Sequence, residues 1–153
     1  MHAYQNSVVV KTTPQELWAL WANPAGWSSW DADIEKASSE SVLRIGSTGK
    51  LTTVRGSEHT FKVLLCDPGS SLMISYQYNM GVELNIKRSW EKVSDGIKVT
   101  QEVTLIGPMA IFTHRLRKEQ FVQMTNQTLQ KLKDHLEGTG NRPAQVSGRP
   151  TFT

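Results

Sequence analysis

The feature that most constrains this chain is a long amphipathic stretch towards its C-terminal end, which we predict to be a helix over residues 109–137. The side chains on its core-facing side recur at alternating steps of three and four residues: Val122, Thr125, Leu129, Leu132 and Leu136. A helix of this length spans roughly 40 Å at about 1.5 Å per residue, so it can cross an entire small domain. The rest of the chain must therefore supply a surface that buries one side of it.

The first part of this helix is predicted to face a different direction. Its apolar residues keep the helical spacing but point nearly opposite to the later stripe: Met109, Phe112 and Leu116. Because one straight face cannot bury both groups, we expect a bend or break near residues 117–120. Gly107-Pro108 marks the start of the helix, and Gly138 marks its end.

The N-terminal part of the chain predicts a strand over residues 2–10 and then a short helix. Thr13 is the expected N-cap, Pro14 occupies the first helical position, and Glu16 completes a capping box. The helix is short because Asn23-Pro24 stops it.

A second short helical turn carries Trp27 and Trp30, which we expect to cover one end of the core. The chain then alternates between apolar and polar residues in segments that predict strands: 33–37, 42–54, 58–66, 71–78, 82–92 and 97–106. The turns between them are short, which favours antiparallel hairpins between neighbours. The predicted fold class is α+β, a curved antiparallel sheet of about six or seven strands around the long C-terminal helix.

Alternation within these strands assigns one face to the core, and it places Leu65 on the same side as Phe61 and Val63. A bent sheet closed by one helix tends to leave a hollow, so we expect a pocket there. Its predicted lining is Phe61, Val63, Tyr76, Leu84, Ile86, Val103, Phe121 and Met124. The same side chains could instead fill the space by packing on one another.

Composition narrows the class of protein. At 153 residues, with 38% hydrophobic and 20% charged residues, the chain is expected to form one globular domain over residues 1–137. No segment has the roughly 20 apolar residues that span a bilayer, and the N-terminus lacks a secretory pattern, so we expect a cytoplasmic protein without membrane insertion. Residues 138–153 are rich in Gly, Pro, Ser and Thr, and we expect them to form a flexible tail.

Nucleic acid, metals and cofactors are not expected partners. Of the formal charge of +3, residues 138–153 contribute +2 through Arg142 and Arg149, so the folded part carries about +1. The four histidines are scattered, and Cys66 is the single cysteine, so no metal-ligand spacing occurs. The sequence leaves open whether the protein is a monomer or a homodimer.

Several short motifs of the chain occur together in one known superfamily. They are Pro14 and Trp18 in the first helix, Trp27 and Trp30 with Asp31, Gly46 with Gly49, the Asp67-Pro68-Gly69 turn, Arg88-Ser89-Trp90-Glu91 before Asp95-Gly96, and Gly107-Pro108. On these motifs the chain resembles the START-like or pollen-allergen-like (SRPBCC) superfamily, in its polyketide cyclase/dehydrase and lipid-transport branch. The resemblance covers about residues 4–137. It implies a helix-grip fold with a cavity for apolar ligands, and it carries over no catalytic residue.

Two functions of different classes follow, with a third beside them. The first is the binding of a small hydrophobic or amphipathic molecule, such as a lipid, a polyketide or an aromatic metabolite, in an internal cavity. The second is an enzyme of polyketide cyclase/dehydrase type that acts on such a ligand, with Arg88, Tyr76, Tyr78 or His114 handling protons. The third is a stress-response or co-chaperone-type interaction protein with a closed core. The candidate ligand-binding residues are Trp30, Phe61, Val63, Tyr76, Tyr78, Leu84, Ile86, Arg88, Gln101, Val103, His114, Phe121 and Met124.

Arg88 stands out because alternation places it on the inward face. A buried guanidinium needs a partner. With Gln101 on the next strand, it could anchor a ligand carboxylate. Alternatively, it pairs with a neighbouring carboxylate such as Glu91 or Asp31. Asp31 and Asp33 form the only close acid pair near the tryptophans, which is more typical of a turn than of a catalytic dyad.

Overall fold

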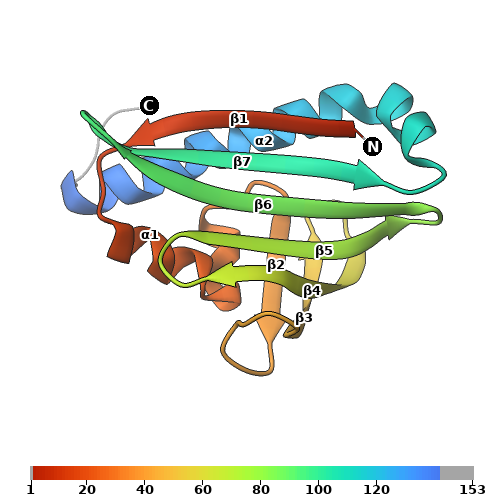
Figure 1. The fold of residues 1–153 in the computed structure, drawn as a ribbon, viewed down its shortest axis with the longest axis horizontal. Coiled ribbons are helices and arrows are strands. Elements are labelled where there is room, and N and C mark those ends of the chain that lie inside the picture. Colours follow the sequence, from red (N-terminus) through yellow and green to blue (C-terminus); the bar gives the residue numbers. More distant parts are fainter. Residues whose placement is uncertain (1, 142–153) are drawn as a thin grey trace.

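The computed structural model describes residues 2–141, with side chains to residue 138. It contains a seven-stranded sheet, two α-helices and one 3-10 helix (Figure 1). Their bounds are β1 His2–Val10, α1 Pro14–Trp21, η1 Pro24–Ser29, β2 Ile34–Ser39, β3 Thr48–Thr53, β4 Glu58–Asp67, β5 Ser71–Asn79, β6 Val82–Val93, β7 Gly96–Ile106 and α2 Ala110–Asn141.

The sheet is antiparallel throughout, with the strand order β1-β7-β6-β5-β4-β3-β2. Strands β2 to β7 each pair with their neighbours in sequence, and β1 returns to pair with β7. Helix α2 runs along β1 and β7 on one side of the curved sheet (Figure 1). The short helix η1 contacts β2, at the opposite edge of the sheet, and α1 packs against η1. This arrangement confirms the predicted α+β class and the helix-grip fold.

The core lies between α2 and the concave face of the sheet. The predicted stripe of α2 is buried at Thr125, Leu129, Leu132 and Leu136, whereas Val122 is half-buried. The two tryptophans of the η1 region, Trp27 and Trp30, are fully buried and close the core beside α1. The expected contribution of both tryptophans to the core is confirmed.

Helix α2 is bent at Arg117, whose φ of −127° and ψ of 15° are not helical. This bend confirms the break expected near residues 117–120. Before it, the apolar side chains of Met109, Phe112 and Leu116 remain exposed, with exposed fractions of 44%, 51% and 83%. The end of the helix was predicted wrongly at Gly138. Because Gly138 does not adopt the positive φ that ends a helix, the backbone continues as helix to Asn141. Residues 142–153, which make up most of the predicted tail, lie outside the described residues.

The start of α1 follows the expected capping chemistry. The Thr13 side chain accepts a hydrogen bond from the backbone N–H of Glu16 at 3.1 Å. Pro14 occupies the first turn, and the helix ends at Trp21, before Asn23-Pro24. The predicted capping box is therefore present on its backbone-binding side.

Two strand predictions need correction. The expected strand 42–54 begins only at Thr48, because Gly46 has a φ of 91° and residues 42–47 form a loop. In β4 the register shifts between Val63 and Leu65, so Leu65 pairs with Met73 and does not share the inward face of Val63. One extra residue in a strand reverses the inward and outward alternation of the side chains after it. Counting alternate residues in the sequence does not reveal such a bulge.

No helix in the described part of the chain is both long and apolar enough to cross a bilayer.

Candidate functional site

A buried ion pair lies in the core between the sheet and α2. Arg88 on β6 donates from Nη2 to Oδ2 of Asp31 at 2.6 Å and from Nε to Oε1 of Gln101 on β7 at 2.9 Å. Both charged side chains are 3% exposed. The guanidinium also lies over the Trp30 ring, 4.7 Å from its centroid. Arg88 therefore has a carboxylate, an amide and an aromatic face as partners before any ligand is considered.

Asp31 ties three parts of the chain together. Its Oδ1 accepts hydrogen bonds from the backbone N–H of Asp33 at 2.9 Å and from the hydroxyl of Thr128 on α2 at 3.3 Å. The Thr128 hydroxyl in turn accepts the backbone N–H of Ala32 at 3.0 Å. With Arg88, these bonds leave Asp31 well satisfied and hold the segment after η1 against both the sheet and the helix.

Asp33 is the second buried acid, and its surroundings differ from those of Asp31. Its Oδ1 accepts from Nη2 of Arg55 at 2.9 Å, and its carbonyl accepts the backbone N–H of Val54 at 2.9 Å. Burial, and then the nearby charge of Asp31, raises the pKa of Asp33 from 3.8 to about 6, although Arg55 and Arg88 act in the opposite direction. Asp33 can therefore gain or lose a proton close to neutral pH.

Burial also changes the pKa values of Arg88 and Tyr76. Burial lowers the pKa of Arg88, and the charge of Asp31 opposes that change. The pKa of Tyr76 on β5 is raised by burial and by the charges of Asp33 and Asp31. Tyr76 therefore keeps its hydroxyl neutral.

These polar groups border an enclosed gap between the sheet and α2. Its lining is Asp31, Asp33, Ile34, Tyr76, Ile86, Arg88, Gln101 and Met124. The gap is too narrow to hold a water molecule. The expectation of a ligand-sized cavity at this place is therefore wrong for the present structure, because the surrounding side chains pack into the space.

Six of the predicted site residues lie at the gap or against its charged cluster: Trp30, Tyr76, Ile86, Arg88, Gln101 and Met124. Five more are packed elsewhere in the core and are fully buried: Phe61, Val63, Leu84, Val103 and Phe121. The last two, Tyr78 and His114, belong to neither group. Tyr78 is half-buried, and its hydroxyl accepts a hydrogen bond from Gln120 at 3.3 Å.

His114 belongs to a separate aromatic cluster. Its ring stacks on His2 at a centroid distance of 4.2 Å, and its Nδ1 lies 2.7 Å from the hydroxyl of Tyr4. Tyr4 stacks in turn on Phe121. His114 is not among the residues that line the gap, so the structure does not bring it together with Arg88.

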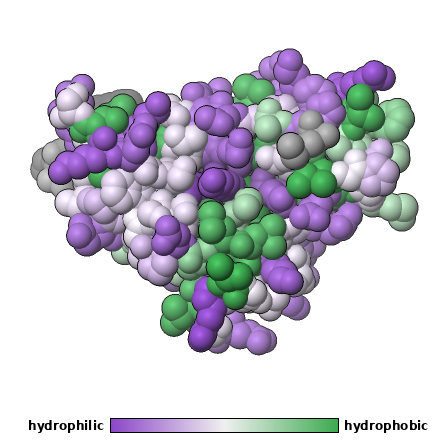
Figure 2. All heavy atoms as spheres, in the orientation of Figure 1, coloured by the Kyte–Doolittle hydropathy of each residue, from purple (hydrophilic) through white to green (hydrophobic). Residues whose placement is uncertain are grey.

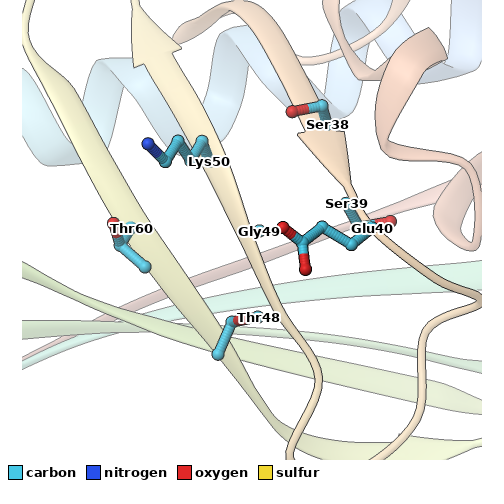
Figure 3. A pocket seen from close by; sticks show the side chains of 7 residues that line it. All are labelled: Ser38, Ser39, Glu40, Thr48, Gly49, Lys50 and Thr60. Atoms are coloured by element: carbon cyan, nitrogen blue, oxygen red, sulfur yellow. The ribbon is translucent and has the colours of Figure 1, made fainter.

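Three gap residues were missing from the predicted site: Asp31, Asp33 and Ile34. The proximity of the two acids to Trp30 was visible in the sequence, but their partners lie far along the chain, on β6 and α2 for Asp31 and in the turn after β3 for Asp33. A second depression, of about 180 Å³, lies on the exposed side of β2, β3 and β4 (Figure 3). Its lining of Ser38, Ser39, Glu40, Thr48, Gly49, Lys50 and Thr60 includes none of the predicted site residues.

Solved structures share this arrangement, whereas no protein-family model and no curated protein matches the chain. The di-domain ARO/CYC StfQ from the steffimycin biosynthetic pathway matches with a TM-score of 0.73 at 10% identity, over 90% of this chain and 52% of StfQ. DynU16, from the dynemicin biosynthetic locus, matches with a TM-score of 0.71 at 14% identity, over 90% of this chain and 48% of DynU16. The chain thus spans about half the length of these two proteins.

The Aha1 dimer from Colwellia psychrerythraea matches with a TM-score of 0.63 at 21% identity, over 90% of this chain and 97% of that one. These likenesses identify the fold as the helix-grip fold. The fold implied by the resemblance to the START-like (SRPBCC) superfamily is therefore present, and it is shared with an ARO/CYC protein and an Aha1 protein.

Proposed function

We propose that the protein binds a small hydrophobic or amphipathic molecule between the sheet and α2, against the Asp31–Arg88 cluster. The observation that carries this proposal is that the buried charged side chains of the described residues, Asp31, Asp33 and Arg88, all line one gap in the core. Burying such groups is costly, and ligand sites typically combine apolar walls with a few polar groups that orient the ligand.

Binding requires the gap to widen, and the residues around it allow such a change. Met124 contributes a flexible, unbranched side chain from α2, and the helix is bent at Arg117, about two turns before it. A ligand would then contact Tyr76 and Ile86 on the sheet and Met124 on the helix. StfQ, which shares the fold, belongs to a biosynthetic pathway, and this supports a small-molecule ligand rather than a macromolecular one.

An enzyme acting on such a ligand is the second candidate. It is favoured by Asp33, whose pKa of about 6 suits proton transfer at neutral pH, and by the neutral hydroxyl of Tyr76, which lines the same gap.

A protein–protein interaction role is favoured by different observations. The interior is closely packed, and large apolar residues are exposed at Val42, Ile45 and Leu64. The backbone of Gly46 pairs with Val63, which brings the loop carrying Ile45 beside β4. Figure 2 shows hydrophobic residues gathered over the β4 and β5 region of the face in view.

Native mass spectrometry of the freshly purified protein, followed by titration with the neutral dye N-phenylnaphthylamine, tests the ligand proposal. We expect a bound small molecule or saturable dye fluorescence. Ile86→Phe fills the gap and should abolish dye binding, while the control Lys87→Phe, at the next position of β6, alters a residue that does not line the gap and should not. Melting curves check that both variants fold. Absence of any bound molecule together with dye binding that Ile86→Phe leaves unchanged would reject the proposal.

A further inference from the structure

The charges around the gap indicate what kind of polar group a ligand could bring. The guanidinium of Arg88 is already compensated, because Asp31 pairs with Nη2 and Gln101 accepts from Nε. A ligand carboxylate would compete with Asp31 for a guanidinium whose charge is already balanced, in a contact in which both partners are 3% exposed. Arg88 is therefore poorly suited to anchor an anion, which was one of the two roles considered for it from the sequence.

Asp33 offers the opposite chemistry. It lines the same gap, and its cationic partner Arg55 comes from the turn between β3 and β4 with a side chain that is 45% exposed. Because a partly exposed ion pair contributes little free energy, a ligand can replace Arg55 at modest cost. Arg55 can then return to water, whereas the Arg88–Asp31 pair has no such exit.

Four ionisable groups act on the Asp33 carboxyl. They are the carboxylate of Asp31, the guanidinium groups of Arg55 and Arg88, and the hydroxyl of Tyr76. Asp31 and Arg88 neutralise each other, and the raised pKa of Tyr76 keeps its hydroxyl neutral. Once Arg55 leaves, the Asp33 carboxylate has lost its cationic partner, so it favours either a new cation or a proton.

We infer that the ligand of this site carries a hydrogen-bond donor at its polar end, foremost a protonated amine, which binds Asp33 in place of Arg55. This inference rests on the ligand-binding function proposed above and names the ligand's chemical class. The apolar part of the ligand lies against Ile34, Ile86 and Met124, and the Tyr76 hydroxyl provides a second polar contact. Carboxylate-terminated ligands of the same length are disfavoured, because they meet Asp33 with a like charge.

The binding of an amine at Asp33 should depend on pH. Its pKa is about 6 without ligand, so the carboxylate is mostly charged at pH 7.5 and mostly protonated at pH 5. A protonated Asp33 attracts an ammonium group much less, so the preference for amines should fall between these two pH values.

Three ten-carbon probes that differ only in their head group provide the experiment: decylamine, decanol and decanoate. Each competes with N-phenylnaphthylamine at pH 7.5. We expect decylamine to bind at least about tenfold more tightly than the other two, equivalent to about 1.4 kcal/mol. Asp33→Asn should remove this preference and leave decanol binding unchanged. Arg55→Gln removes the competing cation but also a charge that lowers the pKa of Asp33, so its preference for decylamine should fall away at a higher pH than in the parent. The control Glu91→Gln, which changes an acid whose side chain is 69% exposed, should have no effect.

The outcomes separate the inference from the function on which it rests. If neither the dye nor any probe binds, the proposed function fails. If decanol and decanoate bind as tightly as decylamine, the inference is overturned while ligand binding stands. Should Asp33→Asn not fold, Arg55→Gln and the pH profile decide: an amine preference that is the same at pH 5 and 7.5, in the parent and in Arg55→Gln, overturns the inference.

Discussion

Replacing Arg88 by methionine tests whether the buried ion pair is needed for stability. Methionine keeps most of the bulk but leaves the Asp31 carboxylate in the core without its cation, and the loss of one partner of a buried pair typically costs about 3–5 kcal/mol. We expect a value towards the lower end of that range, because Asp31 keeps its hydrogen bonds from the Asp33 backbone and from Thr128.

Urea unfolding followed by tryptophan fluorescence measures this loss, since Trp30 lies against the guanidinium. The double variant Arg88→Met with Asp31→Asn should recover a large part of the lost stability, because no buried charge is then left unpaired. The control Lys87→Met removes a positive charge from the neighbouring position of β6 and should change the free energy of unfolding by less than about 0.5 kcal/mol. A loss below about 1 kcal/mol in Arg88→Met, or strictly additive effects in the double variant, would refute the reasoning.

Four further outcomes can be measured on the same protein. The folded state holds the Asp33 proton more tightly than the unfolded chain does, because its pKa is raised from 3.8 to about 6. The stability that this protonation contributes is therefore present below about pH 4 and is lost as the pH rises through about 6. In urea unfolding, the parent should lose about 3 kcal/mol over this range relative to Asp33→Asn. Trp30→Ala should cost about 3–5 kcal/mol, because its ring is fully buried, and a loss below about 1 kcal/mol would contradict that burial. Gly49→Ala should lower the melting temperature by several degrees or prevent folding, since a Cβ there would overlap the Phe61 ring; an unchanged temperature would contradict this packing. Removal of residues 142–153, which we propose to lie outside the folded domain, should leave the melting curve unchanged, and a lower melting temperature would show that they dock.

The order of elements was predictable because each carries local signals. The cap at Thr13 and the spacing of the α2 stripe both depend on residues within a few positions of one another. The bend at Arg117 followed from two apolar groups that no straight helix could bury together. The bulge after Val63 was not predictable in this way, because it depends on how β4 pairs with β5.

The candidate site was predicted only in part for a related reason. The inward direction of Arg88 followed from alternation, and Asp31 was one of two carboxylates considered as its partner. The choice between them depends on contacts 57 residues apart in sequence, and the link from Asp31 to Thr128 spans 97. The width of the gap depends on how complete side chains interlock, and a pattern of apolar and polar positions does not determine it.

The pairing of β1 with β7 has a consequence for how the chain folds. The other six strands each pair with the next strand along the chain, whereas His2 meets Leu105 and Val10 meets Ile97, roughly a hundred residues along the chain. Closing such a long loop is entropically costly, so we expect the β2–β7 meander to form first and β1 to add afterwards. Asp31 and Thr128 are also far apart in sequence, and their hydrogen bond joins the segment just before β2 to α2. A partly folded chain would therefore hold Arg88 and Gln101 side by side on a sheet still open to water, and the polar centre of the core would be sealed in one of the last steps.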